Sequence, residues 1–227
     1  MHASQDMVFA TGEGDKWFGR NRAKLDSFDP ASDLPLKLVE LFSLRPRATV
    51  EVGAANGFRL WAIHERYGSR VVAVEPSESA IADGRSRFPN IQFVNALANA
   101  IPLSVSFDLV ILNAVFHWIG RANLLRSIAE IDRLLIDGGF LIIGDFAPSR
   151  ATRVPYHHRL QQDVYTYKQN YADLFLASAL YQSVAFLLSD HANKGALVAD
   201  TSDHDRWGVW LLRKTLEGNY VDARHVP

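Results

Sequence analysis

Two glycines and one acidic residue are spaced for binding a nucleotide-sized ligand. Gly53 and Gly57 lie between an apolar run at residues 49–52 and a helical pattern at residues 58–67. A glycine turn between a strand and a helix lets a ligand approach the backbone, and the free N–H groups of the first helical turn face that ligand. Glu75 ends the next apolar strand, where an acidic side chain can accept hydrogen bonds from the two hydroxyls of a ribose.

The spacing of the glycines excludes two common nucleotide sites. A dinucleotide site requires glycines at the first, third and sixth positions, where this chain has Gly53, Ala55 and Phe58. A phosphate-binding P-loop ends in Gly-Lys-Ser/Thr, and Gly57 is not followed by that sequence. The pattern that fits is an acidic residue, x, Gly, x, a small residue, x and Gly, starting at Glu51. It resembles motif I of the class I S-adenosylmethionine-dependent methyltransferases, with Ala55 in place of the middle glycine.

Strand and helix patterns alternate along the first two thirds of the chain, which predicts a parallel, doubly wound α/β sheet. The predicted strands are residues 49–52, 71–74, 91–94, 107–112 and 140–143. The predicted helices are residues 16–28, 34–42, 58–67, 78–87 and 121–136. In the last third, we expect a helix over residues 160–176 that carries Tyr165, Tyr167 and Tyr171, then strands at 181–188 and 207–214 joined by a polar loop.

The closing pair of strands resembles the sixth and seventh strands of the methyltransferase sheet, of which the last is antiparallel. The expected fold class is therefore α/β, with a doubly wound, mostly parallel, seven-stranded Rossmann-like sheet. The resemblance covers residues 34–214. We expect one methyltransferase domain at residues 34–227, preceded by an N-terminal segment and cap helix at residues 1–33.

Composition agrees with one α/β domain. The chain has 227 residues, of which 48% are hydrophobic and 22% are charged, an ordinary globular balance. The formal net charge of −1 offers no basic field for nucleic acid or for an anionic membrane. The absence of cysteine excludes disulfides, thiolate zinc sites and a thiol nucleophile. With no signal sequence and no membrane-length apolar run visible, we expect a cytoplasmic location.

A closer resemblance concerns the methylases associated with pseudaminic acid biosynthesis. The segment from Gly12 to Asn21, the tripeptide Val154-Pro-Tyr156 and the ending at residues 207–214 are similar to that group. The chain departs from it at Asn56, which stands one position later, and in an extended loop at residues 192–205. This resemblance points toward sugars or other surface-polymer intermediates as acceptors.

The class I resemblance implies a site for S-adenosylmethionine, with S-adenosylhomocysteine as the product. Glu51 would lie near the methionine ammonium, the backbone of Gly53, Ala54 and Gly57 would pass along the cofactor, and Glu75 would bind the ribose. Pro76 or Ser77 would border the adenine, Asn95 and Ala96 would meet its amine, the Asn113 carbonyl would receive the ammonium, and Trp17 would belong to a cap. Asn95 and Asn113 can also be ordinary turn residues.

The acceptor is expected beyond the carboxyl ends of the strands. The predicted substrate-binding residues there are Phe116, Trp118, Asp145 and Tyr156. Because an oxygen acceptor must lose its proton near the time of attack, a histidine base is useful at neutral pH. His117 is the first candidate, and His157 and His158 are further ones. The alternatives are a positioning role for His117 and a polar surface loop for the adjacent pair.

Other chemistries fit the sequence less well. Asn113 and Asp145 stand where some O-methyltransferases hold a divalent ion, but Phe146 replaces the expected polar neighbour, and no metal is expected. The tetrad at residues 113–116 lacks the prolines that clamp an amino group of a base, so nucleic acid is not an expected partner. The leading hypothesis is methyl transfer to a hydroxyl oxygen of a small molecule. Methylation of nitrogen or carbon and a noncatalytic binding module remain open, as does the oligomeric state.

Overall fold

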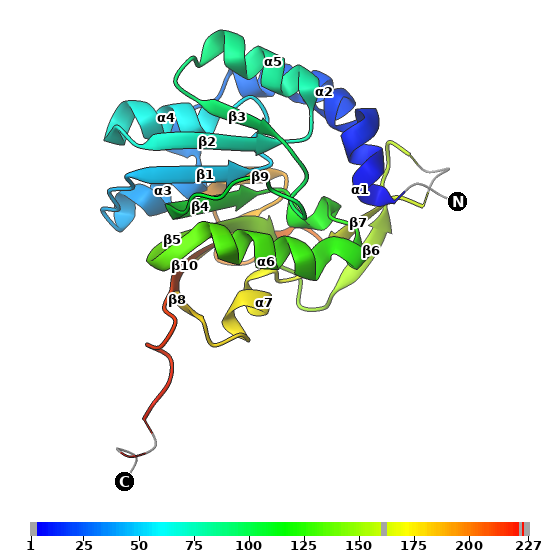
Figure 1. Ribbon diagram of the computed structural model, residues 1–227. Coiled ribbons are helices and arrows are strands. Elements are labelled where there is room, and N and C mark those ends of the chain that lie inside the picture. Colours follow the sequence, from blue (N-terminus) through cyan, green and yellow to red (C-terminus); the bar gives the residue numbers. More distant parts are fainter. Residues whose placement is uncertain (1–3, 160–162, 223, 225–227) are drawn as a thin grey trace.

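The computed structural model describes residues 4–159, 163–222 and 224. Eight strands form one sheet in the order β3-β2-β1-β4-β5-β10-β8-β9, with helices on both faces (Figure 1). The α/β class and the mostly parallel, doubly wound sheet expected from the sequence are confirmed. The parallel strands are β1 (Ala48–Val52), β2 (Arg70–Glu75), β3 (Gln92–Asn95), β4 (Phe107–Asn113) and β5 (Leu135–Phe146).

The crossover helices cover the two faces of this sheet, which explains why its strands are mostly apolar on both sides. Leu38, Leu60 and Ile63 belong to one buried cluster, together with residues of every second position in the strands. Ile131 and Phe175 belong to the cluster on the opposite face. One face is covered by α3 (Leu34–Leu41), α4 (Phe58–Tyr67) and α5 (Glu78–Arg87), and the other by α6 (Leu124–Leu134) and α7 (Ala172–Leu176).

Two helices begin at side-chain caps that the sequence signals. The Asp33 carboxylate accepts a hydrogen bond from the Leu36 N–H at the start of α3, and the Ser77 hydroxyl accepts one from the Ala80 N–H at the start of α5. The N-terminal segment forms α1 (Gln5–Val8) and α2 (Gly14–Asp26), and α2 lies beside α5 in Figure 1.

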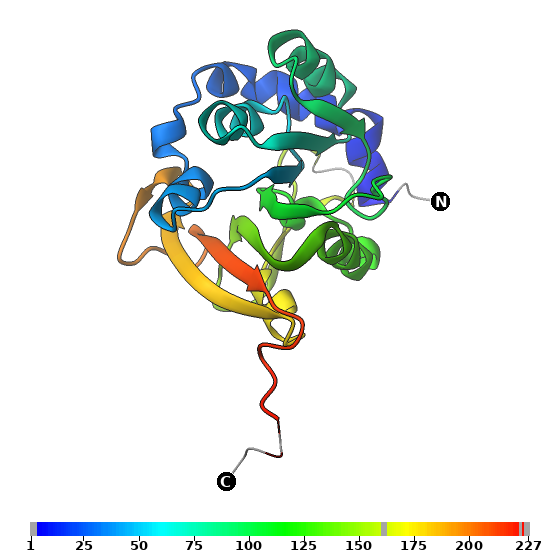
Figure 2. The same cartoon turned by 60° about the vertical axis from the view of Figure 1, so that its left-hand side comes forward.

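The last third of the chain adds antiparallel strands. β10 pairs antiparallel with both β5 and β8, as expected for the last strand. The predicted polar loop after β8 contains a further strand, β9, so the sheet has eight strands instead of the expected seven. The β8–β9 hairpin, orange at its tip in Figure 2, reaches α3, where the Lys37 ammonium donates to the Gly195 carbonyl at 3.3 Å. The bounds are β8 (Tyr181–Asp190), β9 (Asn193–Leu197) and β10 (Arg206–Lys214).

The prediction of a helix over residues 160–176 is wrong. Residues 160–162 lie outside the described part of the chain, and β6 (Thr152–Pro155) pairs with β7 (Tyr165–Lys168) in a separate two-stranded sheet. Only α7 at the end of the predicted range is helical. The burial of β7 alternates between partly buried and buried positions, which is the period of a strand.

The helix predicted over residues 121–136 is shorter than expected. α6 ends at Leu134, and Leu135 already pairs with Phe107 as the first residue of β5. The register then slips, with Gly138 at a φ of +78°, so the Asp137-Gly-Gly139 segment interrupts the strand rather than ending the helix. No helix in the described part of the chain combines the length and apolarity needed to cross a membrane. The cytoplasmic location remains a prediction.

Candidate functional site

A pocket lies at the carboxyl ends of β1, β2 and β4. Between β1 and β4 the connections of the parallel strands change from one face of the sheet to the other, and ligands of such folds bind at this crevice. Of the predicted cofactor residues, Trp17, Gly53, Glu75, Pro76, Ala96 and Asn113 line it. The other lining residues are Asp6, Phe9, Gly14, Val52, Ala55, Leu97, Ala98, Asn99, Ala114, Val115, Trp118, Ile119 and Ser127.

The loop after β1 is held against the pocket by its backbone. The N–H groups of Gly53 and Ala54 both donate to the Val74 carbonyl, at 2.8 and 3.3 Å. Gly53 has a φ of +73°, and a Cβ there would lie 2.3 Å from the Val115 Cγ2 atom, so only glycine fits. Ala55 adopts a φ of +49°, a conformation that costs a non-glycine residue about 1–2 kcal/mol. Ala55 therefore takes the left-handed conformation that the middle glycine of the motif would adopt.

Glu75 is fixed beside this loop by two backbone donors. Its Oε2 atom accepts a hydrogen bond from the Ala55 N–H at 2.9 Å, and its Oε1 atom accepts one from the Ser77 N–H at 2.9 Å. Burial raises the pKa of the Glu75 carboxyl to about 7, while these two N–H groups work in the opposite direction. The side chain is thus oriented at the pocket wall, and each carboxylate oxygen keeps a further lone pair for ligand hydroxyls.

Glu51 does not line the pocket, contrary to the expected contact with the cofactor ammonium. It lies on the opposite face of β1 from Val50 and Val52, where its carboxylate forms an ion pair with the Arg59 guanidinium of α4. Arg59 also binds the Asp33 carboxylate at 2.9 Å. Because Arg59 has a counter-charge on each side, this buried cluster joins β1, α3 and α4, and it gives Glu51 a structural partner inside the protein.

Four further predicted cofactor residues do not line the pocket but stabilise the elements around it: Ala54, Gly57, Ser77 and Asn95. A Cβ on Gly57, whose φ is +82°, would lie 2.8 Å from the Ile91 Cδ1 atom, so close packing of α4 on β3 requires this glycine. The Asn95 amide donates to the Pro76 carbonyl at 3.0 Å. Ser77 caps α5, and Ala54 is fully covered by its neighbours.

The N-terminal segment supplies a wall of the pocket that the sequence does not indicate, apart from Trp17. Asp6 of α1 and Phe9 line it together with Gly14 and Trp17. The Asp6 carboxylate accepts hydrogen bonds from the Gly120 N–H and the Asn123 amide, each at 2.9 Å. Through these contacts α1 is fastened to the segment that follows β4.

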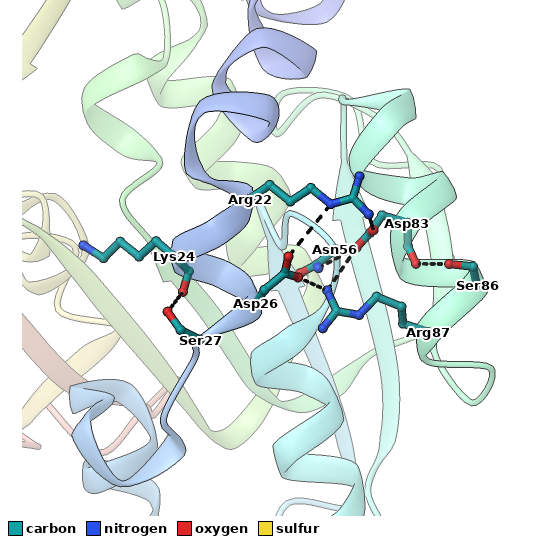
Figure 3. Close-up of polar contacts among 8 residues, drawn as sticks. All are labelled: Arg22, Lys24, Asp26, Ser27, Asn56, Asp83, Ser86 and Arg87. Carbon is teal, nitrogen blue, oxygen red and sulfur yellow. Dashed lines mark hydrogen bonds and ion pairs between the residues drawn. The ribbon is translucent and has the colours of Figure 1, made fainter.

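A polar cluster fastens α2 to α5 and to the motif loop, as Figure 3 shows. Asp83 of α5 is its centre: its Oδ1 accepts from Arg22 of α2 at 2.8 Å and its Oδ2 from the buried Asn56 amide at 2.8 Å. Arg87 bridges Asp83 and Asp26. Asn56, the residue of the loop that differs from the pseudaminic acid group, therefore ties the loop to the helices outside the pocket.

His117 and Asp145 are brought together, although the sequence places them on different strands. The His117 Nδ1 atom lies 2.7 Å from the Asp145 Oδ1 atom, and the Asp145 Oδ2 atom accepts from the His117 backbone N–H at 3.3 Å. His117 belongs to a short 3₁₀ turn, Phe116–Trp118, directly after β4. Burial lowers the pKa of His117, and Asp145 opposes that shift. A carboxylate at Nδ1 fixes the neutral tautomer in which Nε2 is the proton acceptor.

The remaining acceptor candidates lie in different places. Trp118 lines the pocket, whereas Phe116 stacks on Tyr171 in the core with ring centroids 5.0 Å apart. Tyr156 is buried, and its hydroxyl donates to the Glu13 carboxylate at 2.8 Å while its ring packs against Trp118. Tyr156 therefore helps to fasten the N-terminal segment, which contains Glu13, to the rest of the protein. His157 and His158 are exposed and lie outside the pocket, which favours the alternative of a polar surface loop over a role as the base. Within the described residues, no group of three His, Asp or Glu side chains could hold a metal ion.

Comparisons with known proteins match this geometry. Residues 50–143 match the family described as methyltransferase domain. Trans-aconitate 2-methyltransferase of Acidovorax sp. (strain JS42) is 35% identical over 101 residues, which are 43% of this chain and 38% of that protein. Malonyl-[acyl-carrier protein] O-methyltransferase 1 of Coxiella burnetii is 28% identical over 117 residues, 52% of this chain and 40% of that protein. The matched segments thus span about two fifths of the length of these relatives.

The fold also resembles solved structures. The crystal structure of Burkholderia thailandensis 1,6-didemethyltoxoflavin-N1-methyltransferase, with bound 1,6-didemethyltoxoflavin and S-adenosylhomocysteine, superposes with a TM-score of 0.70 at 19% identity. The superposition covers 95% of this chain and 92% of that one. At this identity the likeness concerns the fold. Together with the matching domain, it accounts for the strand order, the glycine loop and the position of the pocket.

Proposed function

We propose that the chain is a class I S-adenosylmethionine-dependent methyltransferase that transfers a methyl group from S-adenosylmethionine to a hydroxyl oxygen of a small molecule. The match of residues 50–143 to the methyltransferase domain and the likeness of the fold support this proposal. The observation that carries the proposal is the pocket at the ends of β1, β2 and β4. Its floor is the Gly53 backbone and its polar wall is the Glu75 carboxylate, with no phosphate-binding lysine in the loop. Such a pocket suits a nucleoside that carries no phosphate.

The residues have distinct roles in the proposed reaction. Glu75 binds the ribose hydroxyls, and the backbone of residues 52–55 and 113–115 bounds the rest of the cofactor. Methyl transfer is an in-line displacement at a sulfonium carbon, so alignment of the acceptor and exclusion of water are the main tasks of the protein. Trp17 and Trp118 supply apolar wall for the second task.

His117 is proposed as the base that takes the proton of the acceptor hydroxyl. Support comes from its contact with Asp145, since a histidine oriented by a carboxylate is the usual arrangement of a general base. The acceptor itself is not carried over from the relatives. Their names specify trans-aconitate, malonyl-[acyl-carrier protein] and a toxoflavin precursor, which differ in chemistry. The link to pseudaminic acid biosynthesis remains a prediction.

Calorimetry tests the cofactor part of the proposal. S-adenosylmethionine and S-adenosylhomocysteine should bind with one site per chain, and NAD⁺ should not bind, because the loop lacks the glycine spacing with which a dinucleotide site receives the pyrophosphate. Incubation with a labelled methyl donor and a panel of hydroxylated metabolites, including nucleotide sugars, then identifies the acceptor by a mass increase of one methyl group. Absence of binding by both sulfur nucleosides would remove the methyltransferase proposal.

A further inference from the structure

Two hairpins bring two lysines to the carboxyl end of β5, beside His117. The β6–β7 hairpin carries Lys168, whose Nζ atom lies 4.2 Å from the centroid of the Phe146 ring. The β8–β9 hairpin carries Lys194, whose Nζ atom lies 3.6 Å from the centroid of the Trp207 ring. The imidazole of His117 contacts both rings, with centroid separations of 5.2 and 6.2 Å. The two ammonium groups therefore lie over rings that pack on His117, whose other neighbour, Trp118, lines the pocket.

Neither lysine has an ion-pair partner among the residues that the structure describes. Lys168 is only 5% exposed and donates to the His204 carbonyl at 2.7 Å, and Lys194 is half-buried. Burial lowers the pKa of Lys168, and it lowers the pKa of Lys194 to about 8. Two carboxylates act on these lysines without contacting them, that of Asp205 on Lys168 and that of Asp145 on Lys194. The Asp145 carboxylate is already bound to His117 and to the Phe146 N–H.

Covering two cations without a counter-charge is costly, because each loses hydration without compensation. The faces of Phe146 and Trp207 return part of this loss, since an aromatic ring attracts a cation over its face. They also keep the ammonium groups turned inward. An anion between them would replace the lost hydration and leave the cluster near neutrality.

We infer that the acceptor carries an oxyanion, either a carboxylate or a phosphate ester, and that Lys168 and Lys194 bind it beside His117. This inference depends on the proposed function, since the site serves as an acceptor site only in a methyltransferase. The anionic group orients the acceptor, so that the hydroxyl of the acceptor points toward His117 and the cofactor. Lysine suits this task because its ammonium acts as a point charge that accepts an oxyanion from several directions.

The test uses inorganic phosphate and acetate as probes for the two kinds of oxyanion. The protein with S-adenosylhomocysteine is titrated with each probe at constant ionic strength, and the indole N–H resonance of Trp207 is followed by NMR, after assignment with Trp207→Phe. At least one probe should give a saturable shift. Lys194→Gln and Lys168→Gln should each weaken binding roughly tenfold, because each removes one charge next to the anion. Saturation by phosphate alone or by acetate alone identifies the source of the oxyanion.

The matched control is Lys16→Gln, which removes the same charge from an exposed position on α2 and should leave binding unchanged. Lys168→Arg keeps the charge and should retain binding, so it replaces Lys168→Gln if that variant does not fold. The absence of a saturable shift with either probe, or equal shifts in Lys194→Gln, would overturn the inference. Calorimetry with S-adenosylhomocysteine reports separately on the proposed function, and the probes are titrated into the free protein if that nucleoside fails to bind.

Discussion

On the side of β1 and β2, the pocket is lined by small residues and backbone, with Glu75 as its one acidic side chain from these two strands. On the side of β5 and β10, the corresponding edge of the sheet carries large charged and aromatic side chains: His117, Asp145, Lys168 and Trp207. Both regions sit at the same edge, at the ends of the strands. Under the proposed function, the ligand would be bound mainly by main chain and by the Glu75 carboxylate in the first region, and by side chains in the second.

From this difference we can predict which substitutions each region tolerates. A site made of backbone is lost when a single Cβ is added, because the chain cannot move away without leaving the sheet. A site made of side chains accepts changes of shape and fails when a charge is removed. Cofactor binding and acceptor turnover should therefore be separable by mutation. The following predictions, in order of expected effect, test that separation and, last, the strain of the loop.

Gly53→Ala should have the largest effect. The new Cβ would lie 2.3 Å from the Val115 Cγ2 atom, at a φ of +73°. We expect calorimetric binding of S-adenosylhomocysteine to disappear. Gly68→Ala is the matched control, because Gly68 also has a positive φ, +65°, but has nothing within 4 Å of the added atom. Gly68→Ala should therefore show only the backbone cost of about 1–2 kcal/mol, without a steric clash. Equal binding by the two variants would show that the loop does not contact the cofactor.

His117→Gln should come next, with an effect confined to turnover. The amide can still donate to Asp145, but the base is lost, so kcat should fall about 10²–10⁴-fold while the affinity for S-adenosylhomocysteine stays unchanged. His157→Ala, at an exposed position outside the pocket, should leave kcat unchanged. A larger loss of cofactor affinity than of kcat in His117→Gln would make His117 a structural residue.

The same histidine sets the expected pH dependence. Burial lowers its pKa below the usual value of about 6.5. The neutral, proton-accepting form therefore predominates at and above neutral pH, and kcat should be level from about pH 7 to 8 and fall only below about pH 6.5. Asp145→Asn removes the carboxylate that raises this pKa, so the fall should move to still lower pH. A rate that rises with pH above 7 in the wild-type protein would point to another base.

Glu75→Gln should weaken cofactor binding by about 1.5–3 kcal/mol, the range for hydrogen bonds to a charged group. The amide can keep one of the two bonds from Ala55 and Ser77 but presents donors to the other. Glu78→Gln is a matched control at an exposed position in the first turn of α5. Unchanged affinity in Glu75→Gln would contradict the assignment of Glu75 to the ribose.

Ala55→Gly should have the smallest effect, and it should be stabilising. Glycine removes the cost of a φ of +49°, about 1–2 kcal/mol, but increases the freedom of the unfolded chain by about 0.4–1 kcal/mol. The net gain should raise the melting temperature by a few degrees, with little change in cofactor affinity. Ala54→Gly, which lacks the strain, should lower the melting temperature, and a similar result for Ala55→Gly would mean that the loop holds no strain.

The parallel half of the fold could be predicted from the sequence because its signals are local. The helix predicted at residues 58–67 has the same bounds as α4, and the strands before and after it begin within one residue of prediction. Apolar runs, glycine turns and the cap at Ser77 each specify their own element. The carboxyl ends of these strands then fix where a ligand binds.

The last third could not be predicted in the same way. β7 is stabilised by pairing with β6, which lies ten residues earlier along the chain, so propensity alone was a poor guide. Tyr165 and Tyr167 alternate with Thr166 and Lys168, and this period of two was the available signal for a strand. All five residues of β9 are partly or fully exposed, and one of them is a glycine, so the strand carries no apolar pattern.

The sequence predicted those site residues whose position follows from the end of a strand. It did not predict those whose position depends on which way a side chain points or on how a distant segment docks. β1 is buried on both faces, so the sequence does not tell which face Glu51 takes, and the pairing with Arg59 decides it. Asp6 and Phe9 line the pocket only because the N-terminal segment docks there, and no periodic pattern announces such docking. Lys168 and Lys194 were missed for the same reason.

The docking of α1 and α2 has a consequence for how occupancy can be followed. Residues from Asp6 to Trp17 form one wall, and the sheet forms the other, so a bound nucleoside touches both and joins them. Filling the pocket should therefore slow amide exchange and proteolytic cleavage in the first helices, while α7, none of whose residues lines the pocket, changes little. Protection of the N-terminal helices would then report the fraction of the protein that has nucleoside bound.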